Sequence, residues 1–325
     1  IGIMKEINSM KFSVTIPAYK RSFLQECIDS VLAQTYADFE LIVVNDASPE
    51  DLDSVLNTYH DSRIHYYKNK RNCGALNVVD NWNICLNYVT GDYIICMGDD
   101  DKLKPNCLEE YYKLIKLFPH LNVYHARTEI IDENSKVIKK QEERPRFESV
   151  YSMIWYRWNG RVQYIGDFLF KVSTLREHNG FFKIPFALCS DDISVAIAAK
   201  ENGIANINNA VFQYRINSQT ISNNGNGKVL MEATVEIWKW YEQFLSEEPI
   251  NSEDKLYWKL LKKSLQERFC KLRYAIIARD LVKNTFSNLW YWVKLRDIYS
   301  LSYLLILRSF ISGFYYRLKI KKTNY

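Results

Sequence analysis

The 325-residue sequence lacks several features that mark particular classes of protein. Its seven cysteines form no C-x-x-C pair and have no histidine at zinc-finger spacing, so we expect reduced thiols rather than disulfides or a zinc site. The segment Ile1–Asn8 has no apolar core of the kind found in secretory signal peptides. The net charge of +5 is too small to indicate nucleic acid as a partner. Together these absences favour a cytosolic protein that does not bind nucleic acid.

No apolar run is long enough to cross a bilayer. The most apolar part of the C-terminal region, Ile298 to Tyr316, is interrupted by Arg308 and falls short of about 20 consecutive apolar residues. Lysine, arginine, tryptophan and tyrosine are frequent around this segment. Such a composition is typical of an amphipathic helix that rests on anionic lipid, although packing onto the rest of the protein explains it equally well. Peripheral attachment to the inner face of the cell membrane is therefore one expectation for this region.

The sequence does contain an ordered alternation of short apolar runs and helical patterns. A hydrophobic share of 47% and an aromatic share of 14% indicate a globular protein, and the length allows two domains. Alternating strands and helices predict an α/β fold with a mostly parallel sheet flanked by helices. The expected strands of the first half are Phe12–Ile16, Glu40–Val44, Arg63–Tyr67 and Tyr93–Met97.

Only helical patterns follow the Ser- and Asn-rich loop from Asn217 to Gly227. They cover Val229–Leu245, Asp254–Ala278 and Leu289–Leu318. The loop is a plausible domain boundary, so we expect an all-helical extension at the C-terminus.

Three aspartates follow the fourth expected strand directly, at Asp99, Asp100 and Asp101. Adjacent carboxylates repel one another unless a cation lies among them, and carboxylate oxygens suit Mg²⁺ or Mn²⁺. The alternative is an acidic loop that only caps the next helix. Tyr19 and Asp46 also follow expected strands, and ligands of parallel sheets collect at this edge.

The order of these motifs resembles the family 2 inverting glycosyltransferases of GT-A fold. The resemblance rests on Val14–Tyr19, Ser30–Tyr36, Glu40–Ser48 and the aspartate loop, and it covers roughly Lys11 to Ser222. It implies transfer of a sugar from a nucleotide-diphosphate donor to a hydroxyl of a saccharide or lipid-diphosphate-linked acceptor in cell-surface polysaccharide assembly.

The resemblance also implies a division of the chain. Residues 1–10 are expected to form a tail, and residues 11–222 a GT-A domain with a nucleotide-binding half, 11–103, and an acceptor half, 104–222. Residues 228–325 form the expected helical region.

Several residues are implied to hold the donor. Pro17, Tyr19 and Asp46 correspond to the positions that bind the nucleotide base in the family. Because a carboxylate accepts the imide N–H of uracil and a tyrosine stacks on the ring, a UDP-sugar is favoured. Asn72 and Gly74 lie where relatives touch the donor. Arg215 precedes the Ser/Asn loop and is expected to clamp the diphosphate, with a surface ion pair as the alternative.

The resemblance implies a metal motif with one member missing. Aligned on the strand, the family's Asp-x-Asp falls on Gly98, Asp99 and Asp100, so the first carboxylate is absent. We expect Asp100 to bind Mn²⁺ or Mg²⁺, and Asp99 to contact the donor or to compensate for the missing acid.

An inverting transfer needs a base that takes the proton of the acceptor hydroxyl. In the family this is a carboxylate at the start of a helix, which corresponds here to Asp191 or Asp192. We expect Asp191 to be the base and Asp192 to be the second candidate. Both would alternatively serve as acidic residues that interact favourably with the helix N-terminus.

Two other functions stay open at this point. A sugar-1-phosphate nucleotidyltransferase would use a similar fold and metal, but Pro17–Arg21 lacks the glycines of its phosphate loop. A non-catalytic nucleotide-sugar-binding or scaffold protein is conceivable because Gly98 breaks the metal motif.

Overall fold

The computed structural model describes residues 10–217 and 226–323, with side chains up to residue 315. These residues divide into two compact units. The first unit contains residues 10–183 and 189–217, and the second contains residues 184–188 and 226–323. The predicted tail and most of the Ser/Asn-rich loop lie outside the described residues, so the predicted domain limits stay predictions.

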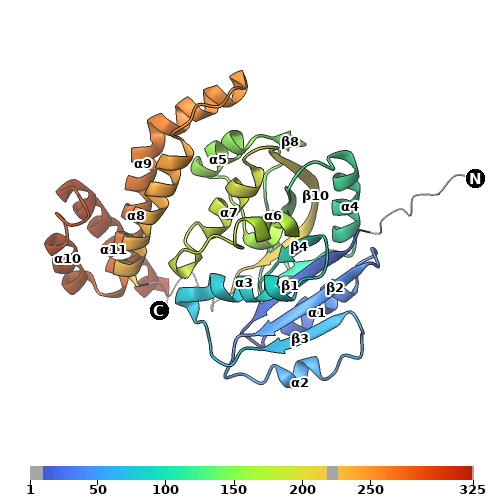
Figure 1. Ribbon diagram of the computed structural model, residues 1–325. Coiled ribbons are helices and arrows are strands. Elements are labelled where there is room, and N and C mark those ends of the chain that lie inside the picture. The colour runs from blue at the N-terminus through green and yellow to red at the C-terminus, as the bar shows by residue number, and fades with distance from the viewer. Residues whose placement is uncertain (1–9, 218–225, 324–325) are drawn as a thin grey trace, which may run out of the picture. The chain divides into compact units, whose positions relative to one another are not determined.

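The first half of the first unit is a parallel sheet. Its four strands lie in the order β3-β2-β1-β4, and every pairing among them is parallel (Figure 1). All seven residues of β2 are buried, as expected for a strand covered on both faces. The strands are β1 (Phe12–Ala18), β2 (Phe39–Asn45), β3 (Ile64–Lys68) and β4 (Tyr93–Cys96).

The helices of this half bury the apolar stripes that their sequences predict. In the first helix, Leu24, Cys27, Ile28 and Val31 are fully buried. The helix begins at Leu24, and no side chain caps its N-terminus. The helices are α1 (Leu24–Leu32), α2 (Asp53–Leu56), the 3₁₀ turn η1 (Ala75–Asn77) and α3 (Val78–Tyr88).

The second half continues the same sheet with mixed strand directions. Strand β9 runs antiparallel to both β4 and β6, whereas β10 runs parallel to β6. The predicted α/β class is confirmed, with parallel pairing concentrated in the first four strands. The strands are β5 (Lys102–Leu103), β6 (Val123–Ile131), β7 (Val137–Lys140), β8 (Phe147–Glu148), β9 (Phe168–Lys171) and β10 (Ile204–Arg215).

Short helices connect these strands. A 3₁₀ turn precedes β9, which begins at Phe168. The helices are α4 (Cys107–Leu117), α5 (Val150–Trp158), η2 (Ile165–Asp167), α6 (Val172–Glu177) and α7 (Ser190–Ala199).

The second unit is helical, as the sequence predicts. It contains η3 (Pro185–Ala187), α8 (Gly227–Phe244), α9 (Ser252–Lys283), α10 (Thr285–Lys294) and α11 (Tyr303–Thr323). Its core includes Leu230, Ile277, Trp292 and Ile306, and the Trp292 indole N–H donates to Asp280 Oδ2 at 3.0 Å.

One expected helix of the second unit is two helices. The pattern from Leu289 to Leu318 is broken between α10 and α11, where Ser300 has a positive φ of 51°. A continuous helix cannot pass through a left-handed residue. Among the described residues, no helix is long and apolar enough to span a membrane.

Candidate active site

The first loop and the acidic loop, Gly98–Asp101, are joined at the carboxyl edge of the parallel strands. The backbone N–H groups of Tyr19 and Lys20 both donate to Asp99 Oδ2 at 2.7 Å. Asp99 is buried, whereas the Tyr19 side chain is 37% exposed. Pro17, two residues earlier, lies within β1 opposite Val44. Asp99 therefore fixes the loop that carries Tyr19 and leaves the Tyr19 ring accessible.

A second group of polar residues gathers around Asp46, directly after β2. Its carboxylate accepts hydrogen bonds from the Asn69 amide at 2.9 Å and from the Cys73 backbone N–H at 2.9 Å. Asn72 and Gly74 belong to the same turn, because the Gly74 N–H donates to Asn72 Oδ1 and Gly74 has a φ of 74°. The structure thus brings Asp46, Asn72 and Gly74 together. Asn69 and Cys73 were missed by sequence reasoning, which has no signal for hydrogen bonds across 23 and 27 residues.

Asp100 and Asp101 turn toward the space above Gly98. A Cβ built on Gly98 would lie 2.9 Å from Asp100 Oδ1 and 3.0 Å from Asp101 Oδ2. The remaining carboxylate oxygens accept hydrogen bonds: Asp100 Oδ2 from the Asn217 amide at 2.6 Å, and Asp101 Oδ1 from the Arg215 backbone N–H at 3.0 Å. The missing side chain at Gly98 therefore leaves space for these two carboxylate oxygens, of which Asp101 Oδ2 accepts from the Gly98 N–H at 3.2 Å.

Arg215 forms hydrogen bonds that hold the backbone of the acidic loop. Its side chain is fully buried, and Nε donates to the Asp100 carbonyl at 2.8 Å. The terminal nitrogens donate to the carbonyls of Asp132 and Glu133, to Ser135 Oγ and to Glu26 Oε2. The guanidinium also lies 4.2 Å from the centre of the Phe23 ring. The clamp expected for Arg215 does not agree with this geometry, because its five N–H groups already have partners.

Asp191 and Asp192 lie in the first turn of α7 but have different surroundings. Asp192 is buried, and its Oδ1 accepts from Arg157 Nε at 2.7 Å and from Gln163 Nε2 at 2.8 Å. Neither residue forms a side-chain cap of the helix. Burial and the neighbouring Asp192 charge raise the pKa of Asp191 to about 7, against the lowering effect of Arg157. Asp191 is thus partly protonated near neutral pH, whereas Asp192 is held in an ion pair.

A stacked pair of tyrosines connects the two acidic groups. The rings of Tyr164 and Tyr214 lie 3.6 Å apart at an angle of 9°. Burial raises the pKa of Tyr214, and the charges of Asp101, Asp100 and Asp191 raise it further. The pKa of the Tyr214 phenol is therefore raised by charges of both the acidic loop and the candidate base. Sequence reasoning passed over both tyrosines, since only the fold brings 164 and 214 together.

The acidic loop fits a divalent ion only in part. Burial and the charge of Asp100 raise the pKa of Asp99 to about 6, and they also raise that of Asp101. Among the described residues, no group of three or more His, Cys, Asp or Glu side chains is arranged to hold a metal. The carboxylate oxygens beside Gly98 are hard ligands, and Mg²⁺ is commonly held by one or two carboxylates together with substrate phosphates. The residues therefore suit an ion that arrives with a phosphate ligand.

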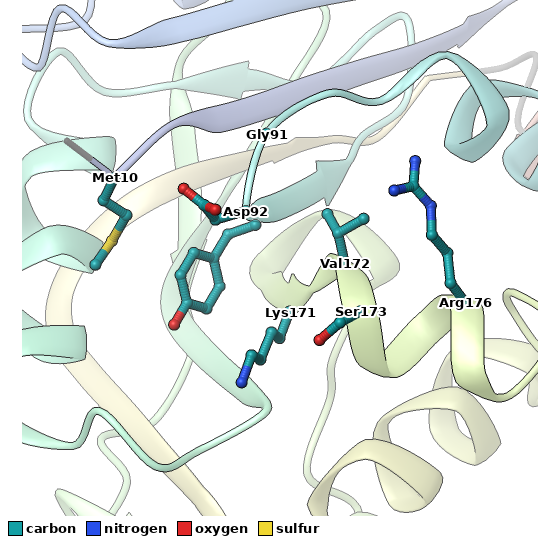
Figure 2. A pocket seen from close by; sticks show the side chains of 8 residues that line it. Met10, Gly91, Asp92, Lys171, Val172, Ser173 and Arg176 are labelled. Carbon is teal, nitrogen blue, oxygen red and sulfur yellow. The ribbon is translucent and has the colours of Figure 1, made fainter. Parts of the chain in front are cut away.

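A cavity of about 760 Å³ lies at the other edge of the sheet. It is lined by residues that precede β1 and β4, including Met10, Gly91 and Asp92, and by Lys171 and Arg176 (Figure 2). The charged ends of Asp92, Lys171 and Arg176 lie apart in Figure 2, and Arg176 donates to the Val89 carbonyl at 2.7 Å. This cavity contains none of the predicted site residues.

Comparisons with known proteins agree with the fold and the motifs. The sequence model described as glycosyl transferase family 2 matches residues 13–178. An uncharacterized glycosyltransferase of Rickettsia typhi is 31% identical over 125 residues, which make up 38% of this chain and 38% of the relative. The match thus spans less than half of that curated relative.

Two solved structures share the fold. Staphylococcus aureus TarS 1–349, in complex with UDP-GlcNAc, has a TM-score of 0.61 at 16% identity and covers 95% of this chain and 92% of its own. The mannosyltransferase PcManGT of Pyrobaculum calidifontis, in complex with GDP-Man and Mn²⁺, has a TM-score of 0.53 at 14% identity, with 94% and 86% covered. The expected GT-A fold with C-terminal helices is confirmed.

Proposed function

The chain belongs to glycosyl transferase family 2, and on this premise we propose that it transfers a sugar from a nucleotide-diphosphate donor to an acceptor hydroxyl with inversion at the anomeric carbon. One observation carries the proposal. Burial and the charges of Asp101, Asp100 and Asp191 all raise the pKa of the Tyr214 phenol, so the acidic loop and the first turn of α7 lie near the same side chain. The carboxylates proposed to face a metal-bound diphosphate, Asp100 and Asp101, are thus close to the carboxylate proposed as the base, Asp191.

Asp191 is the proposed base. A base works best when its pKa lies near the working pH, and burial beside Asp192 raises the pKa of Asp191 to about 7. Asp192 is less suited, because Arg157 and Gln163 already hold its Oδ1. In this proposal Asp191 takes the acceptor proton, and Asp192 together with Arg157 orients the first turn of α7.

The donor is proposed to lie along the first loop. Asp46 would accept from the base, and the exposed ring of Tyr19 would stack on it, while Asn72 and Gly74 border the same turn. The complexes of TarS with UDP-GlcNAc and of PcManGT with GDP-Man support a nucleotide-sugar donor. A UDP-sugar remains our preference, for the hydrogen-bonding reason given above.

A divalent ion, Mn²⁺ or Mg²⁺, is proposed to be held by Asp100, with Asp99 and Asp101 as its anionic surroundings. The Mn²⁺ in the PcManGT complex supports this. When bound, such an ion would neutralise the charge of the leaving diphosphate. The role of Arg215 in this arrangement is to hold the Asp100 backbone.

For the acceptor, the pathway and the location we propose only general classes. We favour a saccharide or a lipid-diphosphate-linked acceptor in cell-surface polysaccharide assembly, on the cytoplasmic face of the membrane. The exposed apolar and aromatic residues of α10 and α11, such as Trp290 and Leu307, support this location.

Nucleotide release tests the proposal directly. The purified chain is incubated with UDP-GlcNAc, UDP-glucose and GDP-mannose, with Mn²⁺ or with EDTA, and the released nucleotide is quantified. We expect Mn²⁺-dependent release from at least one donor and a loss of about 100-fold in Asp100→Ala. The exposed carboxylate of Glu247, changed to Ala, serves as a control and should leave the rate unchanged.

Two outcomes would contradict the proposal. Mn²⁺-dependent release that survives Asp100→Ala would refute the metal ligand. Absence of binding to any nucleotide sugar would favour a scaffold protein instead.

A further inference from the structure

Charge is divided unequally along the chain. Residues 255–325 contain sixteen Lys and Arg against three Asp and Glu, a net charge of +13. Because the whole chain carries +5, residues 1–254 carry a net charge of −8. A segment this basic is attracted to anionic surfaces, with about 1 kcal/mol per Lys or Arg near an anionic bilayer.

Helix α11 in this segment exposes an apolar face. At 100° per residue, its exposed apolar side chains fall within an arc of about 120°. The opposite side of the helix is packed, because Ile306 and Ser309 are buried and a Cβ on Gly313 would lie 2.8 Å from the Ala278 carbonyl of α9. The exposed residues are Tyr303, Leu304, Leu307, Ile311, Phe314 and Tyr315, each between 41% and 70% accessible.

The neighbouring α10 and its loop add aromatic and basic groups. Phe286 is 74% exposed, Trp290 is 62% exposed and Ile298 is 71% exposed. Lys294 Nζ lies 5.5 Å from the Trp290 ring centre, and the Arg296 guanidinium lies 4.2 Å from that of Tyr303. Aromatic rings beside cations are typical of the headgroup layer of a bilayer, where rings sit in the interface and cations meet phosphates.

A groove between α9 and α11, next to the exposed apolar face of α11, also has apolar walls. Its volume is about 840 Å³, and its walls include Tyr274 of α9 and Leu304, Leu305 and Ile311 of α11. Lys271 and Arg308 also line it. Apolar walls with nearby cations suit an acyl chain that ends in an anionic headgroup.

From these observations we infer that the face formed by α10 and the exposed arc of α11 binds the surface of an anionic lipid bilayer. The face is interfacial, since no described helix is long and apolar enough to span a membrane. A second copy of the chain is a poorer occupant, because two segments of +13 would repel each other. Binding to lipid needs no donor or acceptor, so it is tested separately from sugar transfer.

Vesicle flotation of the full chain tests the inference. Vesicles of phosphatidylcholine with 30% phosphatidylglycerol, roughly the charge density of an anionic leaflet, are compared with pure phosphatidylcholine. We expect at least tenfold stronger partition to the anionic vesicles, decreasing with salt. Leu307→Glu should weaken this partition about tenfold.

The matched control is Leu256→Glu, at the start of α9. Leu256 and Leu307 are 58% and 54% exposed, so the two changes place the same charge at equally accessible sites. We expect Leu256→Glu to bind vesicles like the parent. Equal binding by the two variants, with equal melting temperatures, would overturn the inference.

A second measurement does not depend on introducing a charge. Brominated lipid quenches nearby tryptophan, so Trp290→Phe should lose most of the quenching seen in the parent, whereas Trp258→Phe should keep it. Trp258 donates to the Leu245 carbonyl at 3.1 Å and lies outside the proposed face. Dimerisation abolished by Leu307→Glu, without vesicle binding by the parent, would assign the face to a second copy instead.

Discussion

The two acidic groups of the first unit are held by different means. In the acidic loop, backbone N–H groups hold two of the three carboxylates, with Tyr19 and Lys20 donating to Asp99 and Arg215 to Asp101. In the first turn of α7, the Arg157 side chain pairs with Asp192. Within the described residues Asp191 forms no salt bridge, and burial beside Asp192 raises its pKa to about 7.

This difference separates two chemical tasks. Backbone donors are fixed by the fold, so they hold the Asp99 and Asp101 carboxylates in position, and burial raises the pKa of both. A base must gain and lose a proton, and a carboxylate with a raised pKa does this near neutral pH.

The largest effect is expected from Asp191→Asn. If Asp191 is the base, the amide cannot accept the proton, and transfer should decrease about 1000-fold with little change in donor affinity. The measurement is transfer to an added acceptor, with nucleotide binding as the control. A larger loss in Asp192→Asn than in Asp191→Asn would reverse the assignment.

Arg157→Gln should reduce stability by about 3 kcal/mol, because it leaves the buried Asp192 carboxylate without its cation. Urea unfolding at pH 7 measures this. Arg127→Gln is the control, since its partner Glu143 is 69% exposed and the exposed pair should contribute about 1 kcal/mol or less. Equal losses in the two variants would mean that burial does not distinguish the pairs.

The smallest effect concerns pH. The raised pKa of Asp191 means that the carboxylate is charged only above about pH 7. Activity should therefore increase with pH through about 7 and fall roughly tenfold for each pH unit below it. Because Arg157 lowers the pKa of Asp191, Arg157→Gln should move this step to higher pH.

Residual activity of Asp191→Asn provides the control for the pH profile. It should lose the step near pH 7 that the raised pKa of Asp191 predicts. An unchanged profile in this variant would exclude Asp191 as the titrating group.

Much of the fold was predictable because it rests on local patterns. The parallel strands are short apolar runs, and the buried face of α1 follows helical periodicity. The direction of β9 was not predictable, because a strand pattern carries no information on which neighbours it joins. The break between α10 and α11 was missed for a similar reason, since the apolar pattern continues through Ser300.

The candidate site was predictable only as a set of residues. Their order along the chain identified Asp46, Asp99, Asp100, Asp191 and Asp192, and it also identified Arg215. It could not reveal that Arg215 is buried with its five donors in use, since burial depends on Phe23, Glu26 and Ser135 from distant segments.

By itself, the sequence determined the family, the strands and helices of the first unit, and the run of aspartates after β4, since each depends on neighbouring residues. Only the tertiary structure decided what each carboxylate can do. Asp191 and Asp192 are adjacent in sequence, and they differ because Arg157 and Gln163 reach one of them. A pKa depends on burial and nearby charge, and both arise only when distant segments pack together.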